Sequence, residues 1–132
     1  MCGITGFLKL NQSDYKFDPS KIISVMNEEI KTRGPDFQNY WHNNDKNIYL
    51  GHARLSIIDL SSNSNQPIKS KNNRWTIVYN GEIYNYLELK KFLNNNTNLK
   101  GDTQVLVALI EKYGFIKTLE KIDGMFAIAA WD

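Results

Sequence analysis

The chain opens with Met1-Cys2-Gly3-Ile4-Thr5-Gly6-Phe7, the most informative stretch of the sequence. Gly3 and Gly6 flank an apolar segment, which predicts an N-terminus built into a β-sheet rather than frayed. Cys2 is the only cysteine of the chain. Methionine aminopeptidases remove Met1 when the next side chain is small, as Cys is. The mature chain would then begin with a residue that carries both a thiol and a free α-amine.

Such a terminal cysteine can activate itself. A free α-amine has a pKa of about 7.7–8.0, so it is partly unprotonated near neutral pH and can accept the proton of its own thiol. No catalytic histidine is then needed. The alternative is a structural or redox-bystander role, which is the commoner role of a lone cysteine. The predicted sheet at the terminus, and polar groups elsewhere that suit a charged small molecule, favour the nucleophile.

Composition narrows the class of protein. The 132 residues suffice for one domain with one core, and 42% hydrophobic and 23% charged residues are ordinary for a soluble globular protein. A net charge of +2 gives no electrostatic reason to expect nucleic acid or a membrane as partner. One cysteine excludes an internal disulfide and a Cys-pair zinc site, and with two histidines we expect no metal site. Neither a signal peptide nor an 18-residue apolar run is present, so we expect a cytoplasmic protein.

Patterns along the chain predict strands alternating with amphipathic helices. The expected strands are 4–10, 37–42, 48–58, 75–79 and 124–132, and the polar segments 43–46, 61–66 and 94–96 are expected loops. Asp18 before Pro19 predicts the start of a helix that ends at Arg33-Gly34-Pro35-Asp36. Further helices are expected at 86–93, from a cap at Asp102 to Gly114, and at 115–122. Together these elements predict an α+β fold in which helices cover sheets.

The last predicted strand, 124–132, is a continuous apolar run that reads as a buried strand. Domain ends are usually polar and loose. We therefore expect residues 1–132 to be a C-terminally truncated piece of a domain.

Four clusters carry chemistry, and each has a plainer alternative. Arg54 lies in an apolar strand, where it is either a surface residue or a two-hydrogen-bond clamp for a carboxylate. Its neighbour His52 is expected to be structural. Asn80-Gly81 is a hairpin signal, but a helix follows instead of a matching strand. An Asn side-chain amide beside a Gly backbone N–H can form an oxyanion hole.

Two carboxylates complete the set. Glu82 could accept a hydrogen bond from an ammonium group, and Asp102 is first a helix cap and second another ammonium acceptor. The fourth cluster, Arg33-Gly34-Pro35-Asp36, is first a helix end. A nucleophile with its own base, an oxyanion site, a carboxylate clamp and two anionic groups fit an amide that carries an α-amino acid end. Glutamine is the obvious substrate.

The motifs also resemble a known family. The stretches MCGITGF, RGPD, GHARLSIIDLS with the later QP, YNGEIYNYLELK, GDTQV and DGMFAIAAWD run from the first residue to the last. They resemble the N-terminal glutaminase domain of asparagine synthetases, which are class II, N-terminal-nucleophile glutamine amidotransferases. NGEIYN and the LSIIDL segment separate this branch from sugar-amidating and purine-pathway members.

The resemblance implies an αββα sandwich and a set of roles. Cys2 would be nucleophile and base, and Asn80 with Gly81 would form the oxyanion hole. Arg54 would hold the glutamine carboxylate. The other implied substrate-binding residues are Leu55, Ile57, Glu82 and Asp102. Gly34 and Pro35 would lie in a loop near the substrate.

The resemblance also implies a longer parent protein. A C-terminal synthetase domain, absent here, would use ATP and Mg²⁺ to activate aspartate and would receive ammonia through a channel, whereas the glutaminase domain needs no cofactor. A homodimer is left open. So are two rivals: a parent that amidates another carboxylate, as in surface-polysaccharide or antibiotic pathways, and a non-catalytic remnant of the fold. The chain departs from the family at Gly101, where a Ser is usual, and at Gln104, where an acidic residue is usual.

Overall fold

The computed structural model describes residues 2–10, 18–43, 45, 47–93 and 98–132. Its strands are β1 (Gly3–Leu8), β2 (Phe37–Asn43), β3 (Ile48–Arg54), β4 (Ile68–Lys69), β5 (Thr76–Ile83) and β6 (Gly124–Trp131). Its helices are α1 (Pro19–Glu29), α2 (Tyr86–Lys91), α3 (Asp102–Tyr113) and α4 (Phe115–Leu119), with 3₁₀ turns at Lys31–Arg33 and Ser62–Ser64. The α+β class predicted from the sequence is confirmed.

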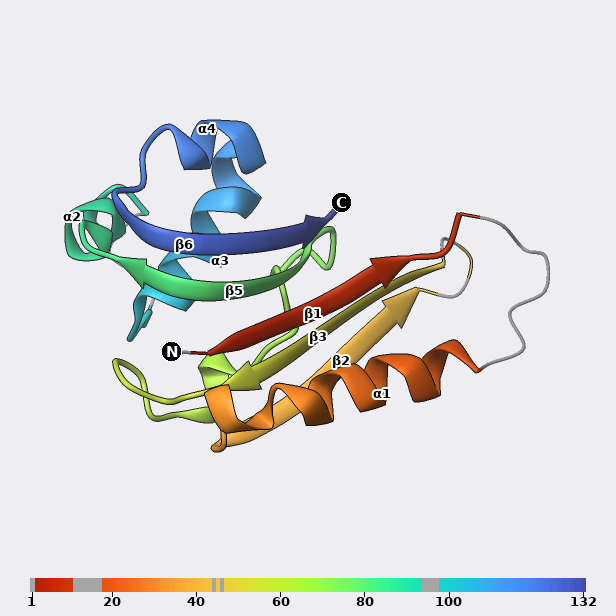
Figure 1. The fold of residues 1–132 in the computed structure, drawn as a ribbon. Helices are drawn as coiled ribbons and strands as arrows, with labels where there is room; N and C mark the ends of the chain where they lie inside the picture. Colours follow the sequence, from red (N-terminus) through yellow and green to blue (C-terminus); the bar gives the residue numbers. More distant parts are fainter. Residues whose placement is uncertain (1, 11–17, 44, 46, 94–97) are drawn as a thin grey trace.

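The strands form two antiparallel sheets. One has the order β1-β3-β2 and the other β4-β5-β6 (Figure 1). Gly3 on β1 lies opposite Ala53 on β3, so the chain's second residue is brought beside the end of β3. Gly81 on β5 lies opposite Phe126 on β6. Strands β1 and β3, far apart in sequence, therefore lie side by side in one sheet.

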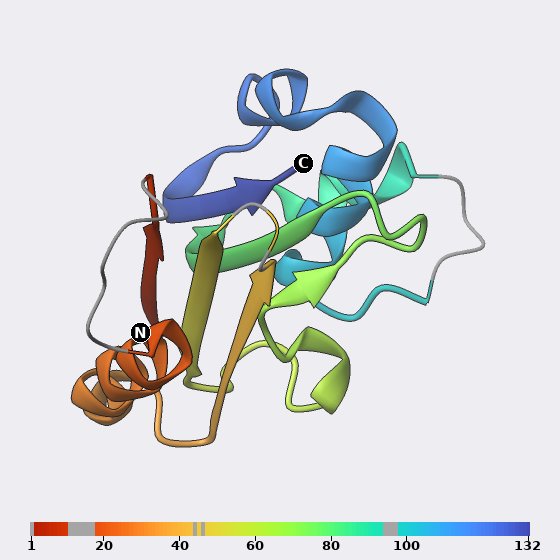
Figure 2. The same ribbon diagram turned by 90° about the vertical axis from the view of Figure 1, so that its right-hand side faces the viewer.

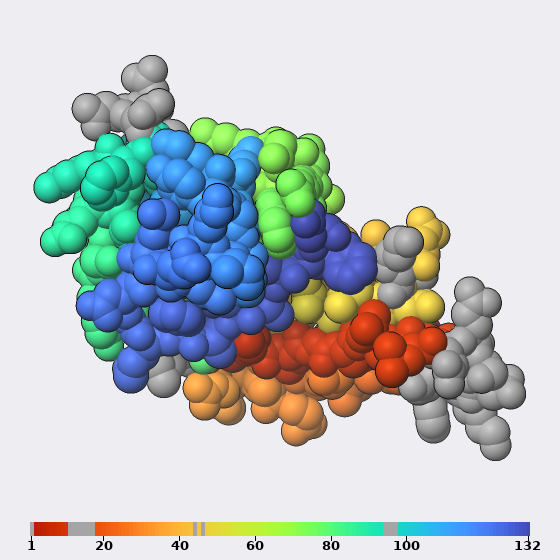
Figure 3. Space-filling model, turned by 90° about the horizontal axis from the view of Figure 1, so that it is seen from above, coloured from red at the N-terminus to blue at the C-terminus, as the bar shows by residue number. Residues whose placement is uncertain are grey.

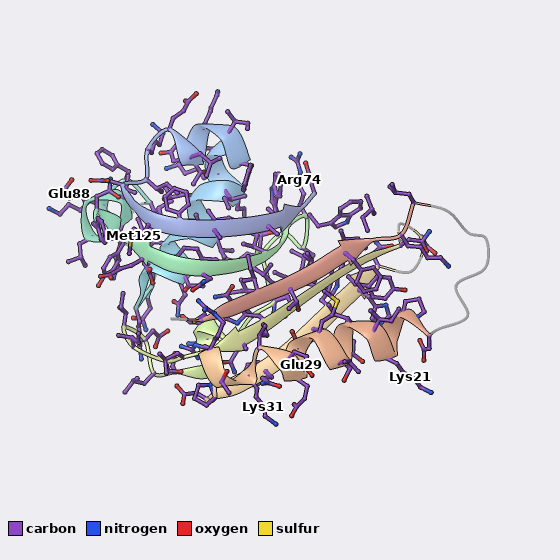
Figure 4. The ribbon with its side chains drawn as sticks, in the orientation of Figure 1. Lys21, Glu29, Lys31, Arg74, Glu88 and Met125 are labelled. Carbon is purple, nitrogen blue, oxygen red and sulfur yellow. The ribbon has the colours of Figure 1, made fainter. Side chains whose placement is uncertain are left out.

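The elements stack in layers. Helix α1 packs on β1, β2 and β3, while α3 packs on β5, and β1 and β3 also contact β5 (Figures 1 and 2). The two sheets thus face each other, with helices on both outer sides. Lys21 and Glu29 point from α1, and Lys31 from the 3₁₀ turn after it, away from the sheet, so this outer face is charged (Figure 4). Helices α3 and α4 and strand β6 make up much of the opposite face (Figure 3).

The main core lies between β5 and the helices that cover it. Among the described residues, six of its aliphatic side chains are completely buried: Ile77, Ile83, Val105, Leu106, Leu109 and Ile110. Each such side chain contributes about 1.5–3 kcal/mol relative to an exposed one. This core fixes the position of β5, and with it the Asn80-Gly81 segment.

The first helix begins as the sequence predicts. The Asp18 carboxylate accepts a hydrogen bond from the Ser20 N–H at 2.9 Å, and Pro19 occupies the first helical position. Ile23 is fully buried against the sheet. Gly114, with φ of 82°, ends α3 as expected.

Strands β3 and β5 end at other residues than the sequence predicts. The expected strand 48–58 stops at Arg54, because the backbone beyond it binds a neighbouring loop: the Ser56 N–H donates to the Asp36 carboxylate at 2.7 Å. Strand β5 does not turn at Asn80-Gly81 but runs on to Ile83. Its partner β6 pairs along this whole length, and a Cβ on Gly81 would collide with the backbone of Met125 and Phe126.

Four further expectations need correction. Strand β1 ends at Leu8 rather than at residue 10, and α4 ends at Leu119 rather than Ile122. Asp102 is not the cap of α3 but its first residue, with Gly101 at the cap position. Strand β6 is present but is not buried: Met125 is 60% exposed. The loops predicted at 43–46 and 94–96 fall partly or wholly outside the described residues.

Candidate active site

One cavity of about 140 Å³ collects residues from both sheets and from α3. It lies at the end of the molecule where the chain begins, beneath the start of β6, where Figure 4 labels Met125. All eight site residues predicted from the sequence line it: Cys2, Arg54, Leu55, Ile57, Asn80, Gly81, Glu82 and Asp102. The structure therefore brings together side chains that the sequence separates by up to 100 residues.

Cys2 lies just before β1 and is partly buried. Its Sγ accepts a hydrogen bond from the Leu55 N–H at 3.3 Å and lies 3.6 Å from the Leu55 carbonyl oxygen, to which the thiol can donate. The Arg33 Nε–H donates to the Cys2 carbonyl at 3.2 Å. The sulfur is thus held by the backbone of the loop after β3.

Arg54 ends β3 and is 6% exposed. Its Nη1 donates to the Ser61 carbonyl at 2.7 Å and to Asn65 Oδ1 at 2.6 Å, and its Nη2 donates to the Asp59 carbonyl. A guanidinium has five N–H donors, so the contacts with the described residues leave two of them, one on Nε and one on Nη2. Arg54 therefore holds the loop 59–65 and retains two donors for an anion.

Asp59 fixes that loop from its other side. Its Oδ2 accepts hydrogen bonds from the Ser64 hydroxyl at 2.7 Å and from Gln104 Nε2 at 2.8 Å, and its Oδ1 accepts the Ser61 N–H at 2.9 Å. Burial by itself would raise the pKa of Asp59. The hydrogen bonds from Ser64 and Ser61 and the nearby Arg54 charge outweigh burial and lower that pKa to about 2.

The two departures from the family pattern meet at Asp59. Gln104 supplies a donor to the carboxylate, which an acidic side chain at that position could do only when protonated. A Cβ on Gly101 would lie 3.1 Å from the Asp59 Cβ, a tight contact that would force the neighbouring atoms to shift slightly. Gly101 and Gln104 thus fit the same buried aspartate.

The segment Asn80-Gly81-Glu82 lies within β5, beside β6. Asn80 is partly buried, and its Oδ1 has no hydrogen-bond partner among the described residues. A buried polar atom without a partner costs free energy, so it indicates a group that meets a ligand or water. Glu82 is exposed at the rim of the cavity.

Asp102 is 5% exposed and faces the same cavity from the start of α3. Its Oδ1 accepts the Thr103 N–H at 2.8 Å, while its Oδ2 accepts the Tyr79 hydroxyl at 2.7 Å and the Ile83 N–H at 3.2 Å. Within the described part of the chain, no Lys or Arg forms an ion pair with it.

His52 joins the two sheets behind the cavity. It is fully buried on β3, and its Nε2 lies 3.0 Å from the Tyr79 carbonyl on β5. Burial is the main cause that lowers its pKa to about 4, with the Arg54 charge adding to the fall and the Tyr79 contact opposing it. The structural role expected for His52 agrees with this geometry.

The Gly34-Pro35 loop supports the site from outside. Pro35 forms a β-bridge with Arg54, and the Asp36 N–H donates to the Arg54 carbonyl at 3.0 Å. A Cβ on Gly34 would collide with the backbone of Ala53 and Arg54. Gly34 and Pro35 do not line the cavity itself but contact Arg54, which does, and their place in a loop near the substrate stays a prediction.

Several residues of the cavity are not predicted from the sequence, above all Tyr79 and Asp59. Tyr79 precedes Asn80 on a strand, so alternation turns its side chain toward the helices, where it reads as core. Asp59 ends an apolar run, which reads as the start of a loop. Only the folded structure shows that these two residues line the cavity.

A family model described as a glutamine amidotransferase domain matches residues 1–132, the whole chain. The chain belongs to the glutamine amidotransferase domain family. This class II domain is similar to asparagine synthetases (glutamine-hydrolyzing) 1 and 2 of Bacillus subtilis, at 37% and 38% identity over the full chain. It is 32% identical to the amidase chry2 of Gibberella zeae, again over the full chain.

The amidotransferase domain spans only part of these proteins: 21%, 17% and 21% of their respective lengths. Among solved structures, it is similar to a glutamine phosphoribosylpyrophosphate amidotransferase from B. subtilis, with a TM-score of 0.52 and 26% identity. That likeness covers 64% of this chain and 21% of the other. No helix in the described part of the chain has the length and apolar character that crossing a bilayer requires. In the same residues, no cluster of three or more potential metal ligands occurs.

Proposed function

We propose that this amidotransferase domain hydrolyses glutamine to glutamate and ammonia with Cys2 as its nucleophile. The observation that carries the proposal is the single cavity in which a thiol, an Asn-Gly segment, a guanidinium edge and a buried carboxylate meet. Glutamine has one reactive amide, one carboxylate and one ammonium group, so each part of the cavity has a matching part of the substrate. The layering supports assignment to the αββα sandwich of N-terminal-nucleophile enzymes.

The charged end of glutamine would lie between Arg54 and the acidic residues. Two N–H groups of Arg54, on Nε and Nη2, have no partner among the described residues and would donate to the α-carboxylate. Asp102, buried without an ion pair, gains from a cation, and Glu82 at the rim adds a second acceptor for the α-ammonium group. Leu55 and Ile57 complete the wall.

The reaction would proceed by acyl transfer. After removal of Met1, the α-amine of Cys2 takes the thiol proton, and the sulfur attacks the side-chain carbonyl carbon of glutamine. The resulting oxyanion accepts hydrogen bonds from Asn80 Nδ2 and the Gly81 N–H. The α-ammonium of Cys2 returns its proton to the leaving nitrogen, ammonia departs, and a glutamyl thioester remains. Water, deprotonated by the same amine, attacks the thioester and releases glutamate.

The ammonia would be used by a further domain of a longer parent protein. We propose an ATP- and Mg²⁺-dependent synthetase domain that amidates aspartate, with the present domain needing no cofactor, and a cytoplasmic setting with a homodimer as one arrangement. Similarity to two asparagine synthetases supports aspartate as the acceptor. Similarity to the amidase chry2 favours keeping another carboxylate as the rival acceptor. A non-catalytic remnant is the second rival.

The test uses Cys2 directly. The protein is incubated with glutamine, ammonia release is measured, and the same sample is treated with a glutamine-like electrophile, a diazoketone bearing an α-amino acid end. Intact-mass spectrometry should show a chain that starts at Cys2 and gains one adduct, since Cys2 is the only thiol. Cys2→Ala should release no ammonia and gain no adduct.

Three results would contradict the proposal. An active protein that retains Met1 would remove the α-amine from the mechanism. Ammonia release by Cys2→Ala at the rate of the unsubstituted protein would exclude Cys2 as nucleophile. A folded protein that starts at Cys2 but neither reacts nor turns over would favour the non-catalytic remnant.

A further inference from the structure

Asp102 is a buried carboxylate whose hydrogen bonds are unevenly distributed. Oδ1 has one partner, the Thr103 N–H at 2.8 Å, which belongs to the adjacent residue. Oδ2 has two partners, the Tyr79 hydroxyl at 2.7 Å and the Ile83 N–H at 3.2 Å, and both come from β5. Among the described residues, Tyr79 is the only one that donates to Asp102 from its side chain. Its hydroxyl shares the carboxylate with two backbone N–H groups and is the one of the three donors that a substitution can remove.

Tyr79 is itself held at several points. Its N–H donates to Gln66 Oε1 at 2.6 Å, and its carbonyl lies 3.0 Å from His52 Nε2. The side chain is 2% exposed and packs among the core residues between β5 and α3. Neither its main chain nor its ring is free to shift without disturbing several buried contacts.

The hydroxyl of Tyr79 acts as a donor. Burial, followed by the hydrogen bond to Asp102 and the charges of Asp102, Glu82 and Cys2, raises the pKa of Tyr79 well above its usual range. The hydroxyl therefore keeps its proton and donates a hydrogen bond to the Asp102 carboxylate. A hydrogen bond to a charged group is about twice as strong as one between neutral groups.

We propose that Tyr79 is a positioning residue that orients the Asp102 carboxylate toward the α-ammonium group of the substrate. This inference rests on the proposed function, in which Asp102 binds that ammonium group. Tyr79 touches the cavity wall but transfers no proton and forms no bond with the reacting amide. It makes the domain select substrates that carry an α-amino group.

The proposal predicts an effect on binding rather than on chemistry. Tyr79→Phe keeps the ring in the core and removes only the hydroxyl. Asp102 then retains two backbone donors and loses its fixed orientation, so the ammonium group binds more weakly in both the ground state and the transition state. We expect KM for glutamine to rise about tenfold, with kcat changed by less than twofold.

The experiment compares two substrates. One is glutamine, and the other is 4-carbamoylbutanoate, which is glutamine without its α-amino group. Ammonia release from each is measured for the unsubstituted protein, for Tyr79→Phe and for the control Tyr84→Phe, whose parent side chain is 55% exposed at the end of the same strand. Tyr79→Phe should raise KM for glutamine alone, and Tyr84→Phe should change neither substrate.

A second variant separates positioning from a general loss of structure. Asp102→Asn removes the charge through which Tyr79 is argued to act. In that background Tyr79→Phe should change KM for glutamine by less than twofold, because the ammonium contact is already lost. Thermal melting of all variants checks that each is folded.

The outcomes are distinguishable. If the unsubstituted protein releases no ammonia from glutamine, the proposed function fails and this inference fails with it. If the unsubstituted protein is active but Tyr79→Phe affects both substrates equally, lowers kcat, or acts as strongly on Asp102→Asn, the inference alone is overturned. A Tyr79→Phe protein that does not fold overturns it too, since the hydroxyl is then a structural requirement.

Discussion

The stability of this fold should fall in mild acid because of His52. This histidine is fully buried and bridges β3 to β5 at Tyr79. Its pKa falls from 6.5 to about 4 in the folded protein, mainly because burial penalises the charged ring. Below pH 6.5 the unfolded chain therefore binds a proton that the folded chain refuses until about pH 4.

The sign and size follow from this difference. Protonation favours the unfolded state, so the His52 contribution is complete above pH 6.5 and is lost progressively as the pH falls toward 4. One pKa unit corresponds to about 1.4 kcal/mol, so the full loss is about 3 kcal/mol and the loss between pH 7 and pH 5 is about 2 kcal/mol. That is a large part of the 5–15 kcal/mol typical of a whole domain.

Urea unfolding at pH 7 and pH 5 tests this, with His52→Gln as the non-titrating variant. Gln keeps an amide N–H for the Tyr79 carbonyl but has no proton to gain. Its free energy of unfolding should change by about 2 kcal/mol less between the two pH values than that of the unsubstituted protein. His42→Gln, at the only other histidine, is the matched control and should keep the loss. Equal acid losses for the unsubstituted protein and His52→Gln would refute the reasoning.

Two further substitutions separate binding from turnover in the proposed reaction. Asn80→Ala should lower kcat for glutamine hydrolysis by roughly a hundredfold or more, the usual cost of one oxyanion donor, and a raised KM with unchanged kcat would contradict its role. Arg54→Ala should mainly raise KM, because a carboxylate clamp acts equally on ground and transition states, although the loop 59–65 that Arg54 also holds will loosen. Steady-state kinetics on both variants measures each split, and a pure kcat effect for Arg54→Ala would exclude the clamp.

Local patterns predicted the element types well, since helices and strands follow from apolar periodicity. The helix start at Asp18-Pro19 and the stop at Gly114 depend on neighbouring residues alone, and the structure confirms both. The ends of β3 and β5 depend on tertiary partners. β3 stops where Asp36 binds Ser56, and β5 continues because β6 pairs with it. No pattern within either strand contains that information.

The candidate site, like the fold, has features that local sequence predicts and features that depend on tertiary contacts. The presence of Cys2, Asn80 and Gly81 in one cavity could be predicted from residue type and order, while their chemical roles stay predictions. Arg54 could be predicted as a member of the cavity, but not its hold on Ser61, Asn65 and the Asp59 backbone. Tyr79 could not be predicted at all, because a buried aromatic on a strand is usually core. Its role depends on where α3 begins, which the strand's own residues do not determine.

The cavity takes its walls from three separate layers: the loop after β3, the middle of β5 and the first turn of α3. A molecule bound there would contact both sheets and α3 at once, and would hold these layers together. Part of its binding free energy would then oppose separation of the layers, about 2.7 kcal/mol at a concentration a hundred times its dissociation constant. The free energy of unfolding would thus be highest while substrate is bound and lowest after the product has left.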